Sequence, residues 1–285
     1  MVDPTESTVI TVISGFGRSM DLGGEACLVV VYGDDLGSRF VLSRTETVVG
    51  RSRDCDIQLE QESASRRHAV LRYGGGEYSV EDLGSTNGTN VNDEPISLAV
   101  LEDGDELRFG RTVMRFLQGD DVEKRYRETL VDIARNDGLT RALTRSSFLE
   151  VLNDEASRAR RYQRFVALAT VTLSGWDQYV AGAGRIYSDL RLRRIAQTLN
   201  STLRRSDKLG RLDEAVFGIL LPETDGEQAL QCVRRLEALI ADETEGLTVE
   251  FGFHAAMGAQ CIDIELLHRA GVQSTMELEL NDAFV

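Results

Sequence analysis

The sequence predicts a multidomain protein in which an N-terminal all-β sandwich precedes a C-terminal α/β domain. Short strand-like runs separated by Gly, Asp and Asn turns occupy residues 28–116, a pattern typical of a β-sandwich. From residue 137 onward, helical and apolar strand-like segments alternate, which is typical of an α/β domain around one sheet. With 285 residues, the chain is long enough for two domains that each bury a core.

Changes in composition and period set the domain boundaries. We expect a flexible polar segment over 1–25, the β-sandwich over 26–118, a helical linker over 119–136 and the α/β domain over 137–285. The expected strands are 28–32, 39–42, 68–73, 112–116, 166–173, 216–221 and 247–253, and the expected helices of the second domain are 145–162, 190–203 and 225–243.

The linker carries an amphipathic stripe. Val122, Tyr126, Leu130 and Ile133 recur at spacings of four, four and three, with charged residues between them. Such a stripe either packs on its own chain or forms a short dimeric coiled coil, and its length of about two heptads leaves both roles open.

Composition excludes several classes of partner and site. A net charge of -15 argues against a nucleic acid or an anionic membrane as the main partner, because either would repel the protein. No apolar run reaches the ~20 residues of a membrane span, and the first residues lack a signal-peptide pattern, so we expect a cytoplasmic protein. The four cysteines lack C-x-x-C spacing, which favours reduced thiols over disulfides or a zinc site; they are Cys27, Cys55, Cys232 and Cys261.

Three polar clusters in the sandwich region hold the residue types that a phosphate requires. A dianionic phosphate needs a fixed guanidinium and neutral hydroxyl donors that converge from different loops. Alternatively, the glycines are turn residues and the arginine is a solvated loop charge, but the three clusters occur together between strand-like runs and favour the anion site. The clusters are Gly50-Arg51-Ser52, Ser65-Arg66-Arg67-His68 and Ser85-Thr86-Asn87-Gly88-Thr89.

With these clusters, residues 26–117 resemble a forkhead-associated (FHA) domain, a module that reads phosphorylated motifs. The resemblance implies that Arg51 and Ser65 hold the phosphate of a phosphothreonine and that Thr86 adds a donor. It also implies that Asn87 holds the peptide backbone and that His68 supports the Ser65 loop without touching the ligand. The phosphopeptide-binding set that it implies is Arg51, Ser65, Arg66, Thr86 and Asn87.

Two motifs anchor the second half of the chain. Asp137-Gly138-Leu139-Thr140 is followed by Phe148, and 207–212 leads through five residues into 218–222. In these motifs the region resembles a GGDEF domain, the diguanylate cyclase fold that condenses two GTP into cyclic di-GMP. Arg141 and Thr144 depart from that family's opening motif, and Asp213-Glu214-Ala215-Val216-Phe217 stands where the family carries Gly-Gly-Asp/Glu-Glu-Phe.

The same comparison implies that the cyclase chemistry is missing and that no catalytic or metal residues remain. Asp213 and Glu214 replace the hairpin glycines that let the backbone approach a guanine nucleotide. Reading these two acids as the signature shifted by two residues is an alternative that breaks the ungapped match to Phe217 and Pro222. Two-metal phosphoryl transfer needs carboxylate oxygens, and the family's metal- and nucleotide-binding positions are occupied instead by Thr172, Ser174, Trp176, Val180 and Ala181, with Asp189 retained.

One nucleotide-binding pattern remains in the second half. Arg204 and Asp207 form an R-x-x-D motif at the offset where active cyclases bind their product, and a guanidinium and a carboxylate can together hold a guanine nucleotide. An ordinary salt bridge at a helix end is the alternative. Cyclic di-GMP is therefore the one ligand expected for this domain, with no other cofactor.

The combined hypothesis is a bacterial signal-transduction protein that binds phosphothreonine and uses an inactive GGDEF-like domain as a cyclic di-GMP sensor or an interaction domain. An active diguanylate cyclase and a purely structural adaptor remain as rivals. The expected partners are a phosphothreonine protein or the chain's own N-terminal tail, a Ser/Thr kinase that modifies Thr8 or Thr11, and a second copy in a homodimer.

Overall fold

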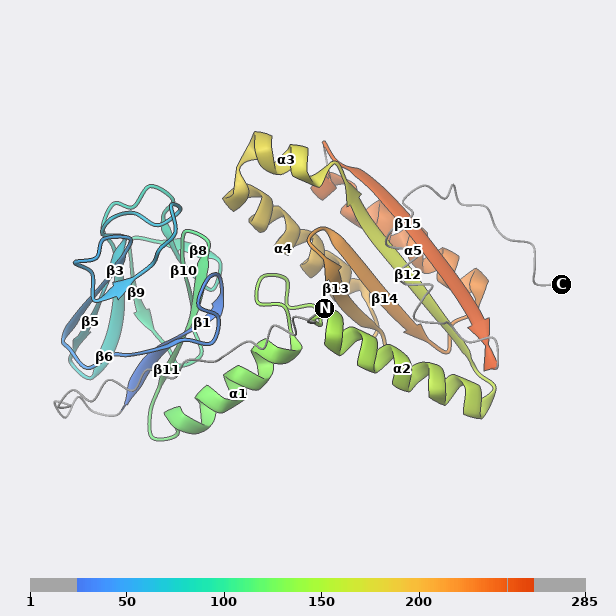
Figure 1. Cartoon of the computed structure of the whole chain (residues 1–285), viewed down its shortest axis with the longest axis horizontal. Coiled ribbons are helices and arrows are strands. Elements are labelled where there is room, and N and C mark those ends of the chain that lie inside the picture. The colour runs from blue at the N-terminus through green and yellow to red at the C-terminus, as the bar shows by residue number, and fades with distance from the viewer. Residues whose placement is uncertain (1–24, 245, 259–285) are drawn as a thin grey trace, which may run out of the picture. The chain divides into compact units, whose positions relative to one another are not determined.

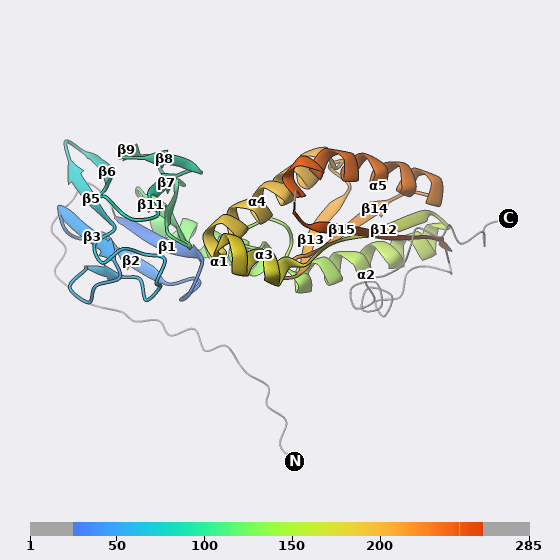
Figure 2. The same ribbon diagram turned by 90° about the horizontal axis from the view of Figure 1, so that it is seen from above.

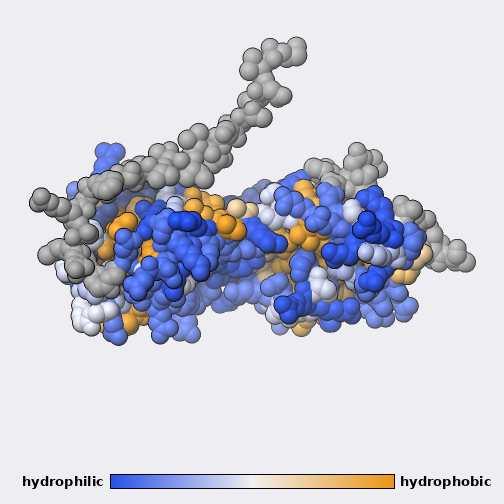
Figure 3. Space-filling model, turned by 90° about the horizontal axis from the view of Figure 1, so that it is seen from below, coloured by the Kyte–Doolittle hydropathy of each residue, from blue (hydrophilic) through white to orange (hydrophobic). Residues whose placement is uncertain are grey.

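The structure is a computed structural model, and it describes residues 25–244 and 246–258. The chain divides into two compact units, Met1–Thr129 and Leu130–Val285, and each is described by itself. Figure 1 shows strands alone in the described part of the first unit up to helix α1 (Val122–Arg135), and strands with helices in the second. Hydrophilic residues cover most of the face of both units drawn in Figure 3, in keeping with 28% charged residues.

The first unit is a sandwich of two sheets that meet on an apolar core. One sheet contains, in spatial order, β2 (Arg39–Val41), β1 (Ala26–Tyr32), β11 (Thr112–Gln118), β10 (Glu106–Phe109), β7 (Thr89–Val91) and β8 (Glu94–Ile96). The other contains β4 (Ile57–Gln58), β3 (Glu46–Gly50), β5 (Ala69–Gly74), β6 (Glu77–Asp82) and β9 (Leu98–Leu101). The inner faces supply fully buried side chains such as Leu28, Leu71, Phe109 and Phe116, which confirms the predicted β-sandwich.

The N-terminal half of helix α1 packs on this sandwich. Val122 is buried, and the Tyr126 hydroxyl donates to the Gly37 carbonyl at 3.1 Å. The Arg39 guanidinium pairs with Glu123 at 2.7 Å and lies over the Tyr126 ring. Of the two roles predicted for the amphipathic stripe, packing on its own chain is therefore found for Val122 and Tyr126.

The second unit is one antiparallel sheet covered by helices, and it confirms the predicted α/β domain. Its strands are, in spatial order, β13 (Lys208–Asp213), β14 (Val216–Pro222), β12 (Phe165–Ser174) and β15 (Thr248–Met257). Figure 2 shows α2 (Arg145–Tyr162) on one side of the sheet and α4 (Arg185–Thr202) and α5 (Gly226–Ile240) on the other. A short helix α3 (Trp176–Ala183) and a 3-10 turn η1 (Asp242–Thr244) complete the described elements.

The Phe148 ring of α2 lies directly on two strand glycines. A Cβ at Gly210 would come within 2.4 Å of this ring, and one at Gly218 within 2.9 Å. The two glycines therefore give Phe148 the space it needs in the core, where it is fully buried.

Four element predictions for the second unit need correction. Strand β13 was missing from the expected strands because charged residues interrupt this edge strand, and helix α3 because it is only eight residues long. Helix α4 begins five residues before the expected position, directly after Gly184, whose φ of +84° separates it from α3. The expected helix 225–243 ends at Ile240 and continues only as the turn η1.

Candidate functional site

Two loops of the sandwich are joined by their backbones at the end of strand β3. The Arg51 N–H donates to the Ser65 carbonyl at 2.9 Å, and the Ser52 N–H donates to the Arg66 carbonyl at 3.0 Å. A Cβ at Gly50 would lie 2.5 Å from the Arg66 carbonyl oxygen, which no real side chain tolerates. Glycine is thus required at position 50 by space, and it lets the Arg51 loop and the Ser65 loop present their side chains together.

A third loop, between β6 and β7, forms hydrogen bonds with the loop that carries Ser65. The Thr86 N–H donates to the Ser65 hydroxyl oxygen at 2.9 Å, and the Ser65 and Thr86 hydroxyls are 3.3 Å apart. The Asn87 side-chain amide donates to the Ser63 carbonyl at 2.7 Å. The structure therefore brings Ser65 and Thr86 into contact, as an anion site requires, while the role of Asn87 toward a ligand stays a prediction.

The guanidinium groups of this site face solvent. Arg51 and Arg66 are both exposed, and neither side chain has an ion-pair or hydrogen-bond partner within the part of the chain that the structure describes. An exposed guanidinium on a loop joined to those of the Ser65 and Thr86 hydroxyls can supply charge-assisted hydrogen bonds to a phosphate monoester.

The buried His68 side chain stabilises the Ser65 loop, as predicted. Its ring is fully buried, its Nδ1 accepts from the Ser65 N–H at 3.1 Å, and its Nε2 lies 3.1 Å from the Gly88 carbonyl. Because Nδ1 is the acceptor, the neutral tautomer with its proton on Nε2 satisfies both bonds. Burial lowers the pKa of His68 below its ordinary value, although the bond to Gly88 and the charge of Asp82 act in the opposite direction.

Asp82, which was not among the predicted site residues, fixes the loop that carries Thr86. Its carboxylate accepts from the Ser85 and Thr89 hydroxyls, each at 2.6 Å, and from the N–H groups of Gly84 and Ser85, each at 2.9 Å. Partial burial raises the pKa of Asp82, but the hydrogen bonds from Ser85 and Thr89 outweigh it and hold the pKa below its usual value. An Asp followed by Gly, Ser and Thr is the sequence signal for such a turn.

In the second unit, the β13–β14 hairpin forms without glycine. Asp213 and Val216 pair across the turn, and neither Asp213 nor Glu214 has a positive φ. Instead, the Arg211 guanidinium holds the turn by donating to the Glu214 carbonyl at 2.8 Å and to both Asp137 oxygens at 3.1 Å. The opening motif and the hairpin are therefore one hydrogen-bonded structure in this chain.

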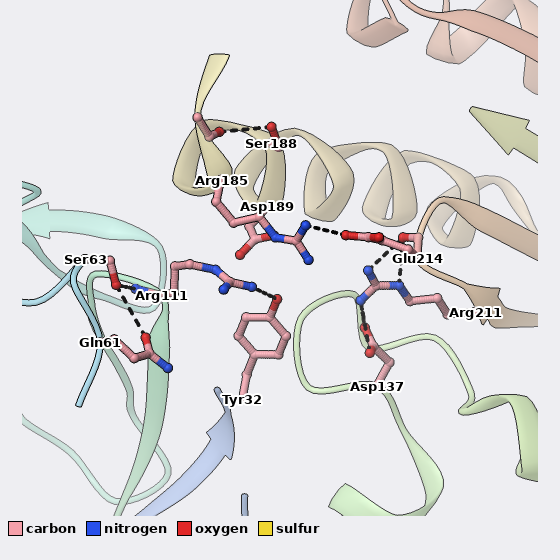
Figure 4. Close-up of polar contacts among 11 residues, drawn as sticks. Tyr32, Gln61, Ser63, Arg111, Asp137, Arg185, Ser188, Asp189, Arg211 and Glu214 are labelled. Atoms are coloured by element: carbon pink, nitrogen blue, oxygen red, sulfur yellow. Dashed lines mark hydrogen bonds and ion pairs between the residues drawn. The ribbon is translucent and has the colours of Figure 1, made fainter. Parts of the chain in front are cut away.

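A second arginine lies beside the hairpin. Arg185, at the start of α4, forms an ion pair with the Glu214 side chain and lies 3.8 Å from the buried Asp189 carboxylate (Figure 4). Glu214 thus holds a cation of its own chain where an active cyclase, by family resemblance, would leave the hairpin open to a nucleotide. The local sequence pattern did not predict this pairing, because the two residues lie on different elements.

Two positions that the family resemblance assigns to metal ligands, Thr172 and Ser174, carry hydroxyls. Thr172 pairs in the sheet with Val216 and Glu250, and the Ser174 hydroxyl donates to the Glu250 carboxylate at 2.7 Å. Trp176, Val180 and Ala181 all lie on helix α3. Within the described ranges, no three His, Cys, Asp or Glu side chains are placed to hold a metal ion.

The R-x-x-D motif forms a turn after helix α4. The Asp207 carboxylate is mostly buried and accepts from the Arg204 N–H at 2.9 Å and from the Ser206 hydroxyl at 3.1 Å. Arg204 is exposed. Asp207 therefore stabilises its own turn, and Arg204 is the member of the pair that faces solvent.

The remaining residues named in the sequence analysis are cysteines or lie outside the described ranges. Cys27, Cys55 and Cys232 are free, and burial raises the pKa of each thiol. Cys261, the segment 1–24 and with it Thr8 and Thr11 lie outside the described residues. No helix among the residues with a described placement is long and apolar enough to cross a membrane.

Comparison with known protein families divides the chain in the same way. The FHA domain model matches residues 47–110, and the diguanylate cyclase, GGDEF domain model matches residues 134–270.

Curated relatives match over the first unit. The glycogen accumulation regulator GarA of Mycolicibacterium smegmatis is 50% identical over 96 residues, which are 34% of this chain and 61% of the relative. The oxoglutarate dehydrogenase inhibitor of Corynebacterium glutamicum is 41% identical over 114 residues, which are 40% of this chain and 80% of that protein. The chain thus spans less than two thirds of the first relative. A solved structure described as a phosphothreonine-dependent FHA domain interaction aligns with a TM-score of 0.32 and 31% identity, over 34% of this chain and 98% of its own.

The buried neutral His68 predicts a pH dependence for the stability of the first unit. Its pKa lies below the ordinary value of 6.5, so the unfolded chain binds a proton more readily than the folded one. The free energy of unfolding should be unaffected by His68 above pH 6.5 and should fall as the pH drops below it, by at most about 1.4 kcal/mol per pH unit.

Urea unfolding followed by amide NMR signals of the first unit, between pH 7.5 and pH 5.5, measures this dependence. The control variant is His254→Gln, because His254 is exposed and lies in the second unit. This variant should keep the pH dependence of first-unit stability. Because the pKa of Asp82 lies below its ordinary value of 3.8, protonation of Asp82 does not change the free energy of unfolding in this pH range. First-unit stability that is constant or rises on acidification through this range contradicts the role of His68.

Proposed function

Since the chain belongs to the FHA-domain family and joins that domain to a GGDEF domain, we propose that it is a bacterial signal-transduction protein that binds phosphothreonine and carries an inactive cyclase domain. Phosphothreonine binding is supported by the hydrogen bonds that join the Arg51, Ser65 and Thr86 loops at one exposed site. A phosphothreonine brings close to two negative charges and the acceptor oxygens that such a site requires.

One ligand of this site is the chain's own N-terminal tail, phosphorylated by a Ser/Thr kinase on Thr8 or Thr11. A ligand tethered by about twenty residues has an effective concentration near millimolar, so even a weak contact would be largely occupied. The tail docks on its own FHA site or on that of a second copy in a homodimer. A phosphothreonine protein that displaces the tail would then be the partner.

The second half of the proposal is that the GGDEF domain makes no cyclic di-GMP. Thr172 and Ser174 offer no carboxylate for Mg²⁺, and the hairpin carries the Glu214 side chain paired with Arg185. The match to the cyclase family model keeps the active enzyme as the second candidate, because Asp137 and Asp189 are retained.

The domain would instead act as a cyclic di-GMP sensor or as an interaction domain. The exposed Arg204 supports nucleotide binding, whereas the use of Asp207 within its own turn weakens the case for a complete R-x-x-D site. An adaptor without any nucleotide is the remaining form of the proposal.

Arg51→Ala should weaken binding of a phosphothreonine peptide by about tenfold or more, because a charge-assisted hydrogen bond contributes roughly 1.5–3 kcal/mol. Calorimetric titration of the full chain with one peptide, phosphorylated and unphosphorylated, measures this. Arg72→Ala, whose side chain pairs with Glu46 and Glu81, is the control and should bind like the wild type. Equal binding of the two peptide forms would refute phosphothreonine recognition.

Purified protein should form no cyclic di-GMP from GTP with Mg²⁺ or Mn²⁺, since the metal carboxylates are replaced. The same protein titrated with cyclic di-GMP separates sensor from adaptor: a sensor loses affinity in Arg204→Ala and keeps it in the neighbouring Arg205→Ala, whereas an adaptor does not bind. Product above a heat-inactivated control would establish the second candidate, the active cyclase.

Phosphorylation of the tail should protect its amides from hydrogen exchange in the wild type and leave them unprotected in Arg51→Ala. Exchange mass spectrometry of peptides from residues 5–14, with and without kinase treatment, makes the comparison. Equal exchange in the two phosphorylated proteins would mean that the tail does not dock on the FHA site.

A further inference from the structure

Four exposed arginines are gathered on the two loops beside the phosphate site. Arg51 and Arg53 lie on residues 50–54, and Arg66 and Arg67 lie on residues 65–67. The backbone hydrogen bonds from Arg51 to Ser65 and from Ser52 to Arg66 hold the two segments together. All four guanidinium groups are therefore carried at one end of the sandwich.

Most other arginines of the described sandwich pair with a carboxylate, and these four do not. Within the described residues, none of the four has a side-chain ion pair or hydrogen bond. Elsewhere in the unit, arginines are paired: Arg39 with Glu123, Arg44 with Asp56, Arg72 with Glu46 and Glu81, Arg108 with Asp93, Arg115 with Glu106, and Arg125 with Asp103.

The loops 51–56 and 59–68, which carry these four cations, also contain Asp54, Asp56, Glu60 and Glu62, of which Asp56 pairs with Arg44. Asp54 lies in the first segment, and its carboxylate accepts from the Ser52 hydroxyl at 3.2 Å. The whole chain carries a net charge of -15, so four exposed arginines on two joined segments are unusual for its composition. A phosphate needs one or two guanidinium groups, which leaves cations for further anionic groups.

We propose that this site takes acidic phosphopeptides, in which Asp or Glu residues flank the phosphothreonine. The inference rests on the proposed phosphothreonine binding and adds the chemistry of the neighbouring peptide positions. Arg51 holds the phosphate, and the basic rim, defined as Arg53, Arg66 and Arg67, attracts the flanking carboxylates. The rim also steers an acidic partner to this end of a protein that otherwise repels it.

Exposed charge pairs are individually weak and are screened by salt. Each flanking carboxylate should improve affinity about threefold at low ionic strength, so two or three of them together should give about tenfold. The gain should shrink as the ionic strength rises, since the Debye length is about 8 Å at physiological salt.

The test compares three synthetic phosphothreonine peptides that share one sequence and carry Glu, Gln or Lys at the same two positions beside the phosphothreonine. Titrated into the full chain at low salt, the Glu peptide should bind about tenfold more tightly than the Gln peptide, and the Lys peptide most weakly. In Arg53→Gln/Arg67→Gln the Glu and Gln peptides should bind within about twofold of each other. The control Arg72→Gln, on β5 opposite Glu46 at the start of β3, should keep the full difference.

The outcomes distinguish this inference from the function on which it rests. Equal affinities of the Glu and Gln phosphopeptides in the wild type, with unphosphorylated peptides unbound, would overturn the acidic preference and leave phosphothreonine binding intact. Failure of all three phosphopeptides to bind would overturn both. A preference for Glu that persists in Arg53→Gln/Arg67→Gln would show that the basic rim is not its source.

Discussion

The contact between the Gly50 backbone and the Ser65–Arg66 backbone is the constraint on which the recognition end of the sandwich depends. It places the Arg51 loop against the Ser65 loop, and a Cβ at Gly50 would force them apart. The neutral ring of His68 then bonds the Ser65 loop to Gly88, and the Asp82 carboxylate fixes the Thr86 loop. Binding groups thus remain on the surface while buried groups hold them in place, which reduces the ordering cost of binding an anion.

Arginine side chains stabilise the β13–β14 hairpin of the second unit. Because Asp213 and Glu214 adopt ordinary φ values, the backbone of this turn forms without glycine. Arg211 joins the turn to Asp137, and Arg185 pairs with Glu214. These ion pairs and the packing of Phe148 on Gly210 and Gly218 are formed within the chain, so the fold of this unit does not depend on a bound substrate.

The sequence predicted the two-domain architecture and indicated three loops that the structure joins, because their signals are local: an Arg after Gly50, a Ser before His68 and a Thr-Asn pair each stand between strand-like runs. It did not predict Asp82 as a site residue, or the pairings of Arg185 with Glu214 and of Ser174 with Glu250, since residues so far apart meet only in the folded chain. Helix α3 and strand β13 were missed because a short helix between glycines and an edge strand with charged residues carry a weak hydrophobic period.

Phosphothreonine is proposed to bind where the Arg51, Ser65 and Thr86 loops meet. Amide NMR spectra of the isotope-labelled full chain, recorded during titration with a phosphothreonine peptide, test it most directly. The largest shift changes are expected at Arg51, Ser65 and Thr86, smaller ones at Gly88, and none at the β5–β6 turn, residues 74–77, at the opposite end of the sandwich. Largest changes at that turn or in the second unit, with Arg51, Ser65 and Thr86 unmoved, would contradict it.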